Sequence, residues 1–103
     1  MQTFLKKRIE VIIEAPALRK LVHALEHKKI IGYTIFPVLA GSGHEGRWDA
    51  AGLIGDTGRM VSVMCVLDSA ELDAVMIDIQ PIIQNQIGIV LISDVQIIRR
   101  EHF

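Results

Sequence analysis

A long glycine-rich segment between two apolar runs is the feature that most constrains how this chain folds. About 18 residues, 40–57, lack helical or strand periodicity and carry glycines and charges instead. Connections in compact domains are usually much shorter, so this length indicates a functional loop or a disordered one. Trp48 beside Arg47 favours the functional loop, because an indole can anchor a partner and a guanidinium can bind an anion. We predict a flexible loop that orders on a ligand or partner, with His44 and Glu45 as further contacts.

A strand–helix–strand pattern precedes this loop. Apolar residues alternate along 9–13 and then recur at helical spacing along 18–25, where Pro16 suits the start of a helix. The aromatic and branched residues along 33–39 predict a second strand, which Pro37 either places at a sheet edge or ends.

The same order returns after the loop. Residues 60–67 form a continuous apolar run typical of a buried strand. Asp68 and Glu71 have the spacing of a capping box, and a second helical stripe follows along 72–79.

The last part of the chain is predicted to hold a turn and two strands. Pro81 is expected to end or kink the second helix, because proline lacks a backbone N–H. Asn85 and Gly88 mark the turn. Apolar residues then predict a strand along 87–92 and a short tail strand along 95–99.

Two strand–helix–strand units joined by a loop predict one α+β domain, residues 1–103, with the ferredoxin-like βαββαβ fold. Both helices then cover one face of the sheet. The central strands are apolar on both faces, so we expect packing between subunits to bury the other face. A closed cyclic assembly would create clefts between neighbouring subunits, with the long loop at their rims.

Composition narrows the classes of function. Half of the residues are hydrophobic and the mean hydropathy is +0.38, which favours oligomerisation over a monomer. The net charge of −1 gives no positively charged surface of the kind that binds nucleic acid. The apolar run along 60–67 is too short to span a bilayer. We therefore expect a cytoplasmic protein that does not bind nucleic acid and does not insert directly into a membrane.

No residue pattern predicts a metal site. The single cysteine, Cys65, lies within an apolar run, where a buried hydrophobic role is favoured over a reactive one. His23 and His27 have metal-ligand spacing on a helix but no obvious third ligand.

In the order and spacing of these features, the chain resembles the PII-like signalling superfamily. The resemblance rests on Gly-Tyr-Thr at residues 32–34, the glycine-rich loop, and the tail Asp-Val-Gln-Ile-Ile-Arg-Arg at 94–100. It implies a homotrimer with nucleotide sites in the clefts between subunits. It also implies that the loop, called the T-loop, reports ligand state to a target protein. Members usually regulate rather than catalyse, so no enzymatic activity is expected.

The predicted nucleotide site combines an apolar slot for adenine with cations and amides for phosphates. The amides along 41–43 are expected to form an anion nest. The residues assigned to this site are Gly32, Tyr33, Thr34, Gly41, Ser42, Gly43, Arg59, Met60, Val61, Gly88, Arg99 and Arg100.

The chain departs from the nitrogen-regulatory members at the turn before the last strand. Those proteins carry a basic Gly-x-Gly-Lys element there, whereas residues 84–88 read Gln-Asn-Gln-Ile-Gly and lack lysine. A shortened turn resembles the divergent PII-like proteins associated with bicarbonate uptake and carboxysomes. We therefore expect ADP or AMP in preference to ATP, with bicarbonate as a candidate anion for the loop.

The leading hypothesis is a regulator that requires no cofactor, binds an adenine nucleotide and contacts a target membrane transporter or metabolic enzyme through its loop. Two alternatives share the fold: a metal-binding trimer resembling CutA, and a small enzyme of the dimeric-barrel type. Both would use histidine or carboxylate ligands in a cleft. A third alternative is an interaction module without a small-molecule ligand.

Overall fold

A computed structural model describes residues 1–28, 30, 32–43, 46–49 and 59–99. The predicted α+β, ferredoxin-like fold is confirmed. The elements are β1 (Phe4–Glu14), the one-turn helix η1 (Ala15–Ala17), α1 (Leu18–His27), β2 (Tyr33–Pro37), β3 (Ala40–Gly43), β4 (Gly46–Asp49), β5 (Met60–Leu67), the one-turn helix η2 (Ser69–Glu71), α2 (Leu72–Ile83) and β6 (Gly88–Ile97).

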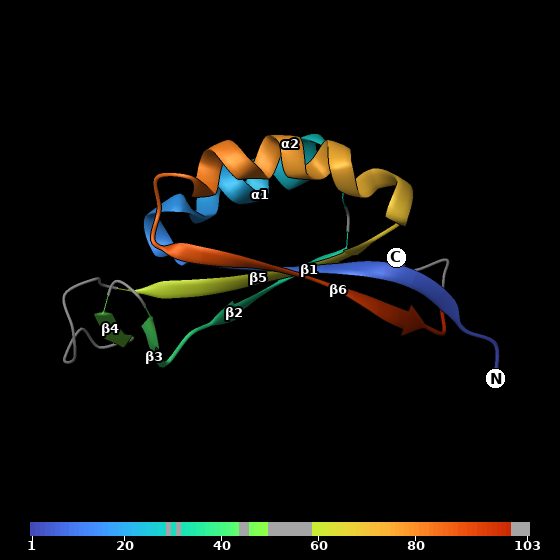
Figure 1. Cartoon of the computed structure of the whole chain (residues 1–103), viewed down its shortest axis with the longest axis horizontal. Helices are drawn as coiled ribbons and strands as arrows, with labels where there is room; N and C mark the ends of the chain where they lie inside the picture. Colours follow the sequence, from blue (N-terminus) through green and yellow to red (C-terminus); the bar gives the residue numbers. More distant parts are fainter. Residues whose placement is uncertain (29, 31, 44–45, 50–58, 100–103) are drawn as a thin grey trace.

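The main sheet has four antiparallel strands in the order β2-β5-β1-β6, so the first strand lies in its interior. Both helices lie on one face of this sheet and leave the other face uncovered (Figure 1). None of the helices in the described part of the chain has the length and apolar character needed to cross a membrane.

The core lies between the sheet and the two helices. Alternation along β1 directs Ile9, Val11 and Ile13 toward the helices, and the apolar stripes of α1 and α2 meet them there. The remaining buried members of this core are Ala17, Leu21, Leu25, Ile30, Val63, Cys65, Leu67, Val75 and Ile79.

Strands β1 and β6 are both longer than the sequence predicts. β1 begins at Phe4, so its basic residues form part of the strand. β6 is one continuous strand of 10 residues where two were predicted, and it includes Ser93 and Asp94. The reason is that β1 offers β6 a backbone partner along almost its whole length, from Phe4 to Ile13.

Pro81 was predicted to end or kink the second helix near Gln80. The helix does not end there, because α2 continues to Ile83. Helical bonding resumes beyond the proline, where the Gln84 N–H donates to the Gln80 carbonyl at 3.0 Å. Ile79 is buried and Ile83 packs against the core, so tertiary packing stabilises the last turn despite the missing donor.

The long loop contains regular structure that the sequence does not predict, because β3 and β4 pair as a separate two-stranded ribbon. Gly41 lies opposite Trp48, and Ser42 lies opposite Arg47. Glycine has low strand propensity, so β3 gives no strand pattern in the sequence; pairing with a partner strand supplies the stability that propensity lacks.

Candidate functional site

The two ends of the main sheet divide the predicted site residues. We call one end the loop end: β1 and β2 end there, at Glu14 and Pro37, and β5 and β6 begin there, at Met60 and Gly88. We call the opposite end the tail end, where β1 and β2 begin and β5 and β6 finish. The loop end lies at the left of Figure 1, on the side of β3 and β4.

Backbone and carboxylate hydrogen bonds join the strand ends at the loop end. The Ala15 N–H donates to the Arg59 carbonyl at 2.9 Å, which joins the end of β1 to the start of β5. The Ile87 N–H donates to the Glu14 carboxylate, also at 2.9 Å, which joins β1 to the turn before β6. Arg59 itself is exposed, and no ion pair among the described residues involves it.

Gly88 is required by close packing at this end. It pairs with Ile13, and a Cβ atom at position 88 would lie 2.3 Å from the Ile12 carbonyl oxygen. Such a contact with backbone cannot be relieved by moving a side chain, so the approach of β6 to β1 by itself accounts for the glycine.

The two neighbouring site residues on β5 are also committed to packing. Met60 is buried with 2% of its surface exposed, and Val61 packs against the core. Any contact that Met60 makes with a ligand therefore depends on its backbone, whereas Val61 is only partly buried.

The ribbon places Gly41, Ser42 and Gly43 on β3, and Arg47 and Trp48 on β4. Paired strands have extended backbone, whereas an anion nest needs alternating right- and left-handed residues. The amides along 41–43 are thus not arranged as the predicted nest. The predicted loop contacts His44 and Glu45 lie outside the described residues.

The remaining described site residues lie at the tail end. Gly32 precedes β2, Tyr33 and Thr34 begin it, and Arg99 follows β6. The Tyr33 hydroxyl donates to the Glu26 carboxylate at 3.1 Å, and this bond raises the pKa of the phenol above its usual value. Arg100 lies outside the described residues.

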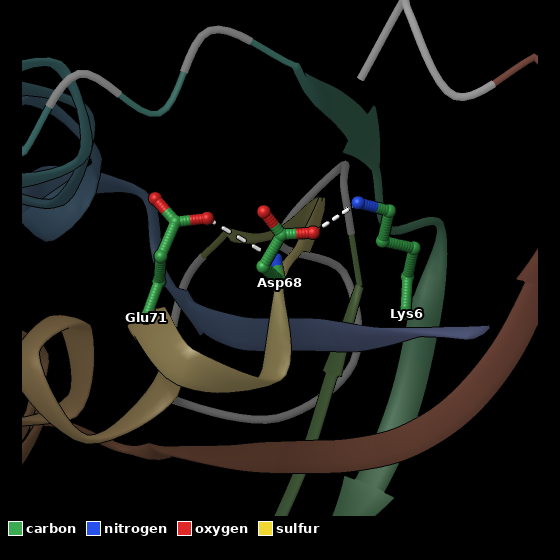
Figure 2. Close-up of polar contacts among 3 residues, drawn as sticks. All are labelled: Lys6, Asp68 and Glu71. Atoms are coloured by element: carbon green, nitrogen blue, oxygen red, sulfur yellow. Dashed lines mark hydrogen bonds and ion pairs between the residues drawn. The ribbon is translucent and has the colours of Figure 1, made fainter. Parts of the chain in front are cut away.

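Two lysine–carboxylate pairs lie toward the tail end. The Lys6 ammonium, with 9% of its side chain exposed, pairs with the Asp68 carboxylate (Figure 2). The Asp68 N–H in turn donates to the Glu71 carboxylate at 3.1 Å, which confirms the predicted capping box. Lys7, the next residue of β1, pairs with Asp94 at 2.5 Å.

The helix-free face of the sheet combines exposed apolar side chains with a polar network. Phe36, Ile89 and Leu91 keep 46%, 52% and 43% of their surface exposed on this face. Among them the Ser62 hydroxyl donates to the Glu10 carboxylate at 2.9 Å, and Arg8 pairs with the same residue at 3.2 Å.

The other chemistry-bearing residues form no site in the described part of the chain. There, no group of three histidine, cysteine or acidic residues is placed to hold a metal ion. Cys65 is buried, as predicted, and desolvation raises the pKa of its thiol to about 11.

A family model of nitrogen regulatory protein P-II matches residues 6–102. The chain belongs to the P-II family. No curated protein matches the chain.

Solved structures support the P-II fold over the whole chain. CPII from Thiomonas intermedia K12, a PII-like protein bound to ADP, AMP and bicarbonate, is 20% identical at a TM-score of 0.86, with 99% of this chain and 96% of CPII covered. CPII bound to ADP and bicarbonate is 22% identical at a TM-score of 0.85, with 99% of this chain and 97% of CPII covered. A PII-like signalling protein from Thermus thermophilus is 17% identical at a TM-score of 0.75, with 100% of this chain and 99% of that protein covered.

For this P-II family member, the geometry separates the predicted nucleotide residues into two groups. Arg59, Met60, Val61 and Gly88 belong to the loop end, next to the ribbon. Arg99 follows the other end of β6, whose 10 residues span about 30 Å at about 3.3 Å a residue. Tyr33 and Thr34 lie nearer, opposite Cys65 and Met64, about 10 to 15 Å along β5 from Val61. Within one chain, Arg99 is therefore remote from Gly88 and the start of β5.

Two further residues, Glu14 and Lys6, shape these ends without having been predicted to do so. The alternation along 9–13 stops at the basic run Lys-Lys-Arg of residues 6–8, so no local pattern places Lys6 in the strand. No local signal indicates that Glu14 contacts a turn 73 residues further along the chain.

Proposed function

We propose that this protein is a non-enzymatic regulator of the P-II family that binds ADP or AMP in clefts between the subunits of a homotrimer. The observation that carries the proposal is the division of the predicted nucleotide residues between the two ends of one sheet. A complete site then requires the loop end of one subunit and the tail end of another.

The uncovered sheet face supports the assembly. Exposed Phe36, Ile89 and Leu91 form an apolar surface that a monomer would leave in water. The network of Arg8, Glu10 and Ser62 on the same face offers directional contacts that fix how the copies face one another.

The ligand class is supported by neighbours with the same fold. CPII is described as bound to ADP, AMP and bicarbonate. The turn before β6 in this chain carries no cation of its own, which favours nucleotides with fewer phosphates over ATP. In this proposal bicarbonate, or a similar small anion, binds at the base of the long loop.

The loop transmits the signal in this proposal. Residues 40–57 change order when the nucleotide or anion binds, and Trp48 and Arg47 then contact a target transporter or metabolic enzyme in the cytoplasm. In this proposal the guanidinium of Arg59, which is exposed where the loop rejoins β5, links the ligand to the loop.

Titration calorimetry against ATP, ADP, AMP and cyclic AMP, with and without bicarbonate, tests the proposal when read beside the mass in solution. We expect a trimer that binds ADP or AMP at micromolar concentration. Arg99→Ala should weaken this binding about tenfold without changing the mass, because a charge-assisted bond to phosphate is lost. A clean trimer that binds no nucleotide would contradict the proposal.

A further inference from the structure

The carboxylate of Glu14 contacts the backbone of the turn before β6. Its Oε1 atom accepts the Ile87 N–H at 2.9 Å. Backbone amides of turns are common donors to phosphate and other anions, and here that donor is already satisfied by the protein itself. The turn is therefore closed by an internal anion.

The charge of Glu14 is not cancelled locally. No ion pair among the described residues involves Glu14, and residues 84–88 contain only neutral side chains. Lys20 lines a hollow of about 430 Å³ together with Asn85 and Gln86, yet it forms no ion pair with Glu14. A full negative charge thus lies against the turn.

From this contact we infer that Glu14 sets the phosphate number accepted by the site. The inference rests on the proposed function, in which a nucleotide binds at the loop end. Coulomb repulsion grows with each negative charge brought near the carboxylate, and the occupied amide cannot also bind a phosphate oxygen. AMP is repelled least and ATP most.

The structure allows a substitution that removes the charge but keeps the contact. In Glu14→Gln the amide oxygen can still accept the Ile87 N–H, so the turn and the end of β1 retain their bond. Asp73→Asn is the matched control, because it removes one negative charge from an exposed position on α2, near the tail end.

The test is calorimetric titration of the wild-type protein and both variants with AMP, ADP and ATP at one ionic strength. We expect Glu14→Gln to bind ATP about fivefold more tightly, ADP by a smaller factor, and AMP within about twofold of wild type. Asp73→Asn should bind AMP, ADP and ATP with affinities within about twofold of those of wild type. High salt should reduce the gain for ATP, because screening weakens the repulsion that the substitution removes.

Two different failures are distinguishable. If Glu14→Gln binds nucleotides but gains no more affinity for ATP than for AMP relative to wild type, Glu14 serves only to hold the turn and the inference is wrong. If neither protein binds any of the three nucleotides, the proposed function fails as well. An equal gain for ATP in Asp73→Asn would assign the effect to net charge and overturn the role of Glu14.

Discussion

The loop end and the tail end of the sheet satisfy their polar groups by different means. At the tail end, Lys6 and Lys7 pair with Asp68 and Asp94 within the chain. At the loop end, backbone bonds and the carboxylate of Glu14 hold the strand ends, and Arg59 is exposed without an ion pair among the described residues. The difference teaches that one sheet can hold its strand ends by two kinds of contact. Lysine–carboxylate pairs do so toward the tail end, whereas backbone and carboxylate hydrogen bonds do so at the loop end, where Arg59 is exposed.

The largest effect is expected at the loop end, from Gly88→Ala. The added methyl would lie 2.3 Å from the Ile12 carbonyl oxygen, so β6 must move away from β1. We expect a loss of about 3 kcal/mol in the free energy of unfolding, at the upper end of overpacking costs. Urea denaturation measures it. A loss below about 1 kcal/mol would show that the loop end is looser than the packing around Gly88 indicates.

A smaller loss is expected at the tail end, from Asp68→Ala. This change removes the capping box and leaves the mostly buried Lys6 ammonium without its carboxylate. Because Asp68 keeps 60% of its side chain exposed, we expect about 2 kcal/mol rather than the cost of a fully buried pair.

Asp68→Asn is the control for that loss, since an amide can still cap the helix but cannot neutralise Lys6. Its free energy of unfolding, measured by urea denaturation, should lie between those of wild type and Asp68→Ala. Equal stability of Asp68→Asn and wild type would mean that the cap, not the ion pair, closes the tail end.

The smallest effect is expected for the exposed pair of Lys7 and Asp94. A double-mutant cycle with Lys7→Gln and Asp94→Asn should give a coupling energy of about 0.5 kcal/mol, because water screens the pair. The coupling should vanish near about 1 M salt. A coupling that survives high salt would indicate that this pair is buried in the assembled protein.

The main elements of the fold were predictable from the sequence because their periodicities are local. Alternation along β1 and the stripe of α1 depend on neighbouring residues, and the capping box spans only Asp68 to Glu71. The continuation of α2 past Pro81 was not predictable in this way, because packing of Ile79 and Ile83 on the core outweighs the missing donor.

The residues assigned to the candidate site stay a prediction, and their arrangement in the sheet was not predictable from the sequence. Which strand ends share an edge of the sheet depends on the register of remote strands, such as Glu14 opposite Met60 and Ile13 opposite Gly88. Local patterns carry no information on that register. The separation of Arg59 from Arg99, and the contact of Glu14 with Ile87, follow from the assembled sheet.

Complementation between two weakly binding variants tests most directly whether the site is divided between chains. Arg59→Ala removes a cation from the loop end, and Arg99→Ala removes one from the tail end, so each homotrimer should bind ADP weakly. When the two variants are unfolded together and refolded as mixed trimers, about a quarter of the clefts should combine an intact loop end with an intact tail end. Calorimetry should then detect ADP binding at wild-type affinity in about that fraction of sites. Mixed trimers that bind ADP no better than either variant would contradict the account.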